Sequence, residues 1–366
     1  MAGFRFFTQP PRLQTAPRRV LAKPSSMRRR SSARKPRPCS VAAPRSGSTF
    51  SATTIPDNYG EYQDPSALDD LLASLSSAGL KWISVRVIWS VVEPDAMGQY
   101  DDIITRNIGR IIDRASSHDI DVMLDFHTLF GVAGHQNWTY PQWAYAGPAG
   151  DQKGSIQIAR DPRTRRAFAS MQAHVVEQLK GWPALKVISV VNEPWGRPDD
   201  IPDLNAMIGD LAAHTRLIAR QKVAIRLAAG WSFTSRRADQ RFDPSLATAF
   251  DVIGMNVYLD PNSETQDSGG ASWTEVDNAA ALVHGQQHLL WITEFGDDTS
   301  NDDQQAAYFT AAVKRMSPTA DVMLGWMWQS SKTEDTFNIA ASWDRGRPSF
   351  HCLTHPDCLR ARPRQL

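Results

Sequence analysis

Short apolar runs alternate along this chain with longer segments whose apolar positions recur every three or four residues. The short runs are rich in β-branched residues, which is typical of strands buried on both faces, and the longer segments have the spacing of amphipathic helices. The runs predict eight strands, at residues 49–53, 83–89, 120–126, 187–191, 223–229, 252–257, 289–293 and 322–328.

The segments between these runs predict helices. In residues 65–79, for example, four leucines share one helical face and Gly79 marks the end. Further helices are expected at residues 106–118, 162–180, 204–219, 276–284 and 303–316, and only a short one, 348–353, follows the last strand.

This alternation predicts an α/β fold, either a closed barrel or a doubly wound sheet. The glycine-rich fingerprint of a dinucleotide-binding sheet is absent after the first strand. Eight βα units in about 280 residues match the size of a (β/α)8 TIM barrel. We therefore expect a TIM barrel as a single domain.

The charges are unevenly distributed. Residues 1–46 contain twelve Arg or Lys and no acid, and the first acidic residue is Asp57. Removing these twelve from the 40 basic residues leaves 28 against 39 acidic ones, a net charge of −11 for the remainder. An acidic body argues against a nucleic-acid partner. No apolar run approaches the roughly 20 residues of a membrane span.

The basic start predicts a leader at residues 1–47 that is disordered or cleaved, before a barrel at 48–350 and a tail at 351–366. The leader has no apolar core of a secretory signal. It resembles an organellar transit peptide, but a misassigned start codon or a nucleic-acid-binding arm would have a similar composition.

The three cysteines do not form a disulfide scaffold, since Cys39 lies in the leader and Cys352 and Cys358 lie near the C-terminus. The segment 351–358 has the residue types of a small zinc site, but a local disulfide or two free thiols is the favoured interpretation. We expect no metal and no cofactor.

Two of the predicted strands end in a glutamate. Residues 187–191 run into Asn192 and Glu193, and a second apolar run, 290–292, reaches Glu294. Active sites of α/β barrels lie at the carboxyl ends of the strands. A solvated strand-end acid would explain either glutamate alone, but the fourth and seventh strands of a closed barrel face each other across its mouth. The two therefore suggest a pair.

Other chemistry-bearing side chains fall at the same strand ends. They are Arg86, Trp89, His127, Asn256, Tyr258, Trp326 and Trp328. Two carboxylates across a cleft lined by aromatic residues is the arrangement that cleavage of a glycosidic bond requires. A neighbouring arginine, for which we select Arg86, would keep a nucleophilic carboxylate ionised. We expect Trp328 at the site and Trp326 in packing.

The strand ends Asn192-Glu193-Pro194 and Glu294-Phe295-Gly296 resemble those of clan A glycoside hydrolases, with family 5, the cellulase-like retaining β-glycanases, as the nearest match. The resemblance extends over residues 57–348. It implies that Glu193 is the acid/base and Glu294 the nucleophile, and that Asn192 binds the sugar 2-hydroxyl.

The resemblance also implies roles for the remaining residues: Arg86 and Tyr258 would position Glu294, His127 would line the same subsite, and Trp328 would form a sugar-stacking floor. One position departs from the family pattern, because Asn256 stands where the family usually carries histidine. Asparagine can still donate a hydrogen bond but holds no charge, which leaves the substrate in doubt.

We therefore expect a retaining hydrolase of a β-linked glucan, mannan or related glycan, acting as a monomer on an oligo- or polysaccharide. The alternative is a non-catalytic carbohydrate-binding barrel. A metal-dependent hydrolase would need several metal ligands at the strand ends, and His127 is the only candidate. Family resemblance favours secretion, whereas the leader allows organellar targeting.

Overall fold

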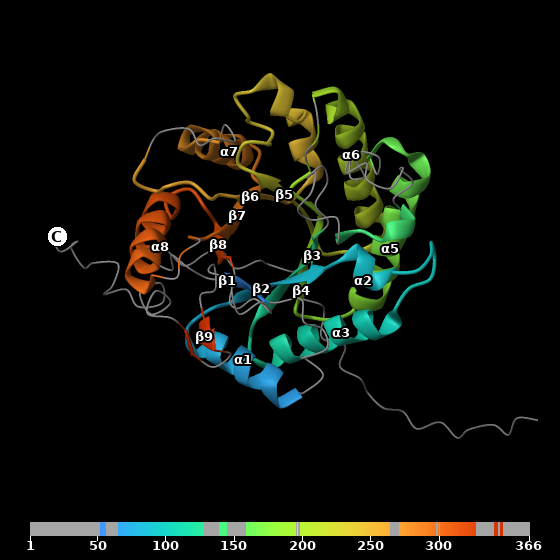
Figure 1. Cartoon of the computed structure of the whole chain (residues 1–366), viewed down its shortest axis with the longest axis horizontal. Helices are drawn as coiled ribbons and strands as arrows, with labels where there is room; N and C mark the ends of the chain where they lie inside the picture. Colours follow the sequence, from blue (N-terminus) through green and yellow to red (C-terminus); the bar gives the residue numbers. More distant parts are fainter. Residues whose placement is uncertain are drawn as a thin grey trace, which may run out of the picture. The chain divides into compact units, whose positions relative to one another are not determined.

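Eight parallel strands close into a barrel in the order of the sequence, with the first strand hydrogen-bonded to the last (Figure 1). The computed structural model describes residues 52–55, 65–127, 139–144, 159–194, 196, 198–263, 271–297, 299, 301–326, 340–342 and 345–346. The expected (β/α)8 TIM barrel is thus confirmed. The domain boundaries drawn at 47 and 350 lie outside the described residues and stay predictions.

The strands lie close to the predicted runs. They are β1 (Ala52–Ile55), β2 (Trp82–Val87), β3 (Asp121–Phe126), β4 (Leu185–Asn192), β5 (Lys222–Ala228), β6 (Val252–Asn256), β7 (Leu289–Phe295) and β8 (Val322–Gly325). Two of them end at least two residues earlier than expected. Strand β2 stops at Val87 because a short helix, α2 (Trp89–Val92), follows it, and β8 stops at Gly325, so Trp326 lies beyond the strand.

Helices surround the strands (Figure 1). They are α1 (Pro65–Ser77), α3 (Asp102–Ser117), α5 (Pro162–Leu179), α6 (Ile201–Ile218), α7 (Trp273–Gly285) and α8 (Asp302–Met316). Several begin at a side chain that accepts backbone N–H groups, as Asp101, Asp161 and Asn301 do. An antiparallel pair, β9 (Ala340–Ser342) and β10 (Arg345–Gly346), follows the barrel and was not expected.

The core lies between the strands and the helices. All four leucines of α1 that were expected on one face are buried, and β2, β4 and β7 are buried along almost their whole length. None of the helices that the structure describes is both long and apolar enough to span a membrane.

Polar residues are also buried inside the barrel, at the strand positions nearest its mouth. Arg226 of β5 is fully buried and is paired in register with Asn192 of β4 and Gly254 of β6. Asn256 at the end of β6 is in register with Glu294 of β7. Buried charges and amides need partners, so these strands place a polar network at the mouth of the barrel.

Candidate active site

The two strand-end glutamates have different backbone settings. Glu294 lies within β7 and is almost fully buried. Glu193 follows β4 with a φ of 45°, in the left-handed region, and its N–H donates to the carbonyl oxygen of Arg226 at 2.9 Å. A left-handed residue with a side chain costs on the order of 1 kcal/mol and persists where the surroundings enforce it. Here the enforced turn ends the strand and half-buries the Glu193 side chain.

Arg226 joins two carboxylates inside the barrel. One end of its guanidinium donates to Asp125 of β3 and the other to Oε1 of Glu294, and it also donates to the carbonyl oxygen of Thr293 at 3.1 Å. The hydroxyl of Tyr258 donates to the other oxygen of Glu294, Oε2, at 2.8 Å. Both oxygens of Glu294 are therefore held in place.

The sequence analysis did not select Arg226, which lies beside Glu294 as a cation. The guanidinium carbon of Arg86 lies 5.0 Å from the ring centroid of Trp326, and the expected role of Arg86 in positioning Glu294 stays a prediction. The sequence held the necessary signal, because Arg226 also interrupts an apolar run and must find a buried partner.

Asn256 connects Glu193 to its neighbours. Its Nδ2 donates to Oε1 of Glu193 at 2.9 Å and to Oδ1 of Asn192 at 3.1 Å, while its own Oδ1 accepts from the Thr293 hydroxyl at 2.7 Å. The Thr293 bond fixes which end of the amide faces Glu193. Asn256 thus supplies a neutral donor at the position where the resemblance led us to look for histidine.

The close approach of Thr293 depends on a glycine. A Cβ atom at Gly254 would lie 2.7 Å from the Thr293 methyl carbon and 2.9 Å from its hydroxyl oxygen, closer than real Cβ contacts occur. Gly254 therefore makes room for the side chain that orients Asn256.

His127 lies at the end of β3, where its Nδ1 is 2.9 Å from Oδ2 of Asp125. Burial lowers the pKa of His127 to about 4, so its ring is neutral at neutral pH. With Asp125 as acceptor, the proton of the neutral ring lies on Nδ1 and Nε2 is left as an acceptor. Burial alone would raise the pKa of Asp125, but Arg226 and the His127 bond bring it below its ordinary value.

Trp326 stacks on the His127 ring, with centroids 5.5 Å apart and an angle of 15° between the planes. We expected Trp326 to serve in packing. Strand β8 ends at Gly325, the residue before Trp326, and the half-buried ring of Trp326 lies at the mouth of the barrel. Trp328 lies outside the described residues, so its place at the site stays a prediction.

Burial dominates the electrostatics of both glutamates. It raises the pKa of Glu193, and the Asn256 bond and the charge of Arg226 oppose this rise. It raises the pKa of Glu294 to about 8 despite Arg226, with Glu193 adding to the rise and Tyr258 acting against it. The charge of Arg226 thus favours the ionised form of Glu294, as expected of a neighbouring cation, and burial opposes it. Because their charges interact, the titration of each carboxyl depends on the other, and neither titration step can be assigned to one glutamate alone.

The sequence profile of Cellulase (glycosyl hydrolase family 5) matches residues 44–332, which cover both glutamates and all eight strands. The chain belongs to glycosyl hydrolase family 5. It is accordingly a glycoside hydrolase, as the paired strand-end glutamates led us to expect. No curated protein sequence matches the chain.

Several solved structures share the fold. An exo-β-1,4-mannosidase from an Opitutaceae bacterium has a TM-score of 0.61 at 15% identity, over 85% of this chain and 59% of that one. A GH5_18 protein from Bifidobacterium longum, in complex with Manβ1-4GlcNAc, has a TM-score of 0.64 at 14% identity, over 86% and 78%. An endo-1,4-β-D-mannanase from Thermotoga petrophila has a TM-score of 0.63 at 13% identity, over 83% and 98%. The chain thus spans less than two thirds of the first of these three.

Three residues of this family 5 site escaped the sequence analysis: Asp125, Arg226 and Thr293. Each lies inside a strand rather than after it, so a search of strand ends passes over them. In the part of the chain that the structure describes, no group of three or more His, Cys, Asp or Glu side chains is arranged to hold a metal ion. The zinc-like segment 351–358 lies outside that part.

Proposed function

We propose that this protein is a retaining β-glycoside hydrolase in which Glu294 is the nucleophile and Glu193 the acid/base. The observation that supports this assignment most is the unequal hydrogen bonding of the two carboxyls. Glu294 accepts from a guanidinium and a phenol, whereas Glu193 accepts from one neutral amide. Hydrogen bonds from a cation favour the ionised form, so when the pair holds one proton we place it on Glu193.

The reaction then proceeds in two displacements. A carboxylate oxygen of Glu294 attacks the anomeric carbon and forms an ester, while the bond to the leaving oxygen breaks and that oxygen takes the proton of Glu193. In the second step Glu193 removes a proton from water, whose oxygen attacks the anomeric carbon and releases Glu294. Each group ends in its starting protonation state, and no cofactor is consumed.

Other residues of the network would position the glutamates and the sugar. Arg226, anchored by Asp125, and Tyr258 would fix the attacking carboxylate of Glu294. The amide nitrogen of Asn192 is buried and has no acceptor among the described residues, which fits a donor to a sugar hydroxyl. His127 and Arg86 would line the same subsite, Asn256 would orient Glu193, and Trp328 would form the floor.

For the substrate we propose a β-linked glucan, mannan or related glycan, bound by a monomer without nucleic acid or membrane. Mannan is included because two of the structures above are named as a mannosidase and a mannanase, although their low identity supports the fold alone. The alternative, a non-catalytic sugar-binding barrel, would bind β-linked glucan or mannan oligosaccharides and hydrolyse none of them.

The assignment is tested by azide rescue of two variants. Glu294→Ala opens space on the face from which the nucleophile attacks, so added azide is expected to give a glycosyl azide of inverted configuration. Glu193→Ala retains the nucleophile, so an activated aryl glycoside still forms the ester and azide releases it with retention. Glu177→Ala, at an exposed position of α5, is the matched control and keeps wild-type activity.

The anomeric configuration of each product is read by proton NMR. The same anomer from both variants, or inversion by the wild type, would remove the assignment of the two glutamates.

A further inference from the structure

Strand β4 carries one residue more than its neighbour β5 near its carboxyl end. Ser189 is in register with Ala224 of β5, and Asn192 is in register with Arg226, so residues 190 and 191 lie opposite a single residue of β5. An extra residue of this kind forms a β-bulge. Bulges occur often at the rims of barrels and beside active sites, where they redirect a side chain.

The bulge determines which way the end of β4 faces. Ser189 and Asn192 are three residues apart, so a regular strand would point their side chains to opposite faces of the sheet. Because of the extra residue, both are paired with residues on one face of β5, and Asn192 accepts from Asn256 at 3.1 Å. Glu193 follows with its left-handed backbone and accepts from the same nitrogen of Asn256 at 2.9 Å. Two consecutive side chains thus reach one donor.

Two side chains bond the carbonyl groups of the bulge. From helix α5, Nε2 of Gln172 donates to the carbonyl oxygen of Val190 at 2.5 Å. The hydroxyl of Ser189 donates to the carbonyl oxygen of Val191 at 3.3 Å. A bulge disrupts the ladder of the sheet locally, and buried carbonyl groups need partners, so these two donors stabilise the irregular stretch.

Gln172 differs from most residues on the buried face of α5, which is largely apolar. Its side chain is only 1% exposed and lies among Ala167, Phe168, Met171, Val175, Val176 and Leu179 on that face. A buried amide is costly unless it is hydrogen-bonded, and an apolar residue would fill the position without needing a partner. The bond to β4 therefore indicates a role of Gln172 beyond packing.

Strand β7 has a similar irregularity beside Glu294. Its register with β6 shifts between Met255 and Asn256, which makes Thr293 the extra residue of β7. The carbonyl oxygen of Thr293 accepts from Arg226 at 3.1 Å. In both strands that carry a glutamate, a side chain from another element thus bonds a carbonyl group of the bulge.

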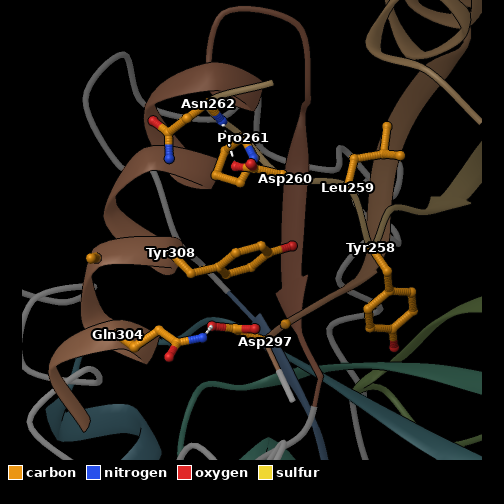
Figure 2. A pocket seen from close by; sticks show the side chains of 10 residues that line it. Tyr258, Leu259, Asp260, Pro261, Asn262, Asp297, Gln304 and Tyr308 are labelled. Carbon is orange, nitrogen blue, oxygen red and sulfur yellow. Dashed lines mark hydrogen bonds between the residues drawn. The ribbon is translucent and has the colours of Figure 1, made fainter. Parts of the chain in front are cut away.

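The helix beside β7 contacts the chain at a different point. A pocket of about 530 Å³ lies between the segment that follows β6 and the first turns of α8 (Figure 2). Gln304 of α8 donates to Asp297 at 3.2 Å, at an exposed position three residues beyond Glu294 (Figure 2). Gln172 of α5 instead bonds the strand itself, three residues before Glu193. The β7 bulge is held from inside the barrel, and the β4 bulge from an outer helix.

We propose that Gln172 is a positioning residue for the acid/base of this enzyme. Its bond to Val190 holds the bulge of β4 in the register that turns Asn192 and Glu193 towards Asn256. Gln172 acts through the strand and does not touch the substrate. This inference rests on the proposed function, in which Glu193 gives its proton to the leaving oxygen.

The test uses the full-length protein and two aryl β-glycosides of the sugar that the wild type hydrolyses. A dinitrophenyl leaving group departs without a proton, whereas a phenyl leaving group needs one from Glu193. Gln172→Met removes the donor and keeps a side chain of similar length. We expect kcat/KM to fall about tenfold or more for the phenyl glycoside and less than about twofold for the dinitrophenyl glycoside. The ratio of the two values does not depend on the folded fraction, so it separates positioning from a loss of stability.

Gln178→Met is the matched control, since Gln178 is an exposed glutamine of the same helix and bonds Asp102. It is expected to leave both rates unchanged. Ser189→Ala removes the other bond of the bulge at the loss of one oxygen atom, and it is expected to lower the ratio in the same direction. Ser189→Ala decides the question if Gln172→Met does not fold.

Glu193→Ala separates a failure of this inference from a failure of the proposed function. As the acid, Glu193 must show the same preference for the better leaving group when it is removed. Equal losses on both substrates in Glu193→Ala would reject the acid/base assignment itself. If Glu193→Ala shows the preference while Gln172→Met and Ser189→Ala lower both rates equally, or change neither, the positioning role of Gln172 is overturned.

Discussion

The two glutamates of the candidate active site are held by partners of different charge. On the β7 side, Glu294 is buried and bonded to a guanidinium that is itself anchored by Asp125. On the β4 side, Glu193 is half-buried and bonded to a neutral amide whose other end is held by Thr293. In the proposed mechanism this difference separates the nucleophile from the acid: a charged partner favours the carboxylate, and a neutral one leaves the carboxylic acid available.

Removing Arg226, the cation between Asp125 and Glu294, should have the largest effect. Arg226→Met leaves Asp125 and Glu294 buried without their cation, which costs about 3–5 kcal/mol of stability and lowers kcat by on the order of a thousandfold. Urea unfolding and kinetics on an aryl glycoside measure the two losses.

Arg226→Lys is the control for this change. It keeps the positive charge but cannot bridge both carboxylates with a planar fork, so it is expected to recover stability more than activity. Equal recovery of both would mean that the bridge serves the fold alone.

The pH dependence of activity sharpens the comparison. The pair must hold one proton, and burial raises the pKa of both carboxyls, so the alkaline fall of kcat/KM is expected at a higher pH than an ordinary carboxyl group would give. The bond from Asn256 stabilises the ionised form of Glu193. Asn256→Ala should therefore raise the pKa of Glu193, shift the alkaline limb to higher pH and lower kcat about tenfold.

Rate profiles from pH 4 to about 10 give this limb directly. Asn205→Ala, on helix α6, provides a control that leaves it in place. An alkaline limb at the same pH in Asn256→Ala and the wild type would show that Asn256 has no influence on the shared proton.

The smallest effect is expected from a substitution at Gly254, which acts on Glu193 indirectly through Thr293 and Asn256. A methyl group there collides with Thr293, so Gly254→Ala is expected to cost about 1–3 kcal/mol and to lower activity a few-fold by loosening Asn256. Gly209→Ala in α6 is the matched control, because its added carbon meets Leu246 at an ordinary 3.4 Å. Calorimetry and the pH profile test the pathway: Gly254→Ala should move the alkaline limb in the same direction as Asn256→Ala, and an unmoved limb would contradict it.

Most of the fold could be predicted because the period of apolar residues changes between strands and helices along the whole barrel. Glu193 and Glu294 could be predicted for a related reason, since a carboxylate at the end of an apolar strand can be recognised from the sequence alone. The family match confirms the family that these strand ends resembled, and the roles of the individual residues stay proposals.

The partners within the barrel could not be found in this way. Arg86 and Arg226 both interrupt apolar runs, which shows that each needs a buried partner but not that Arg226 bridges Asp125 and Glu294. That pairing depends on how the strands stagger when the barrel closes. Likewise, Trp326 and Trp328 have the same parity along the chain, and it is the end of β8 at Gly325 that brings Trp326 against His127.

The position of Arg226 inside β5, two residues before the end of the strand, affects how this enzyme could diversify. Its guanidinium reaches Asp125 on β3 and Glu294 on β7, so these charged groups are connected through strands and not through the loops above them. In α/β barrels the loops vary most readily and determine what is bound. Exchange of the loops could therefore alter which glycan is bound, while the strands keep Arg226 bonded to the carboxylate of Glu294.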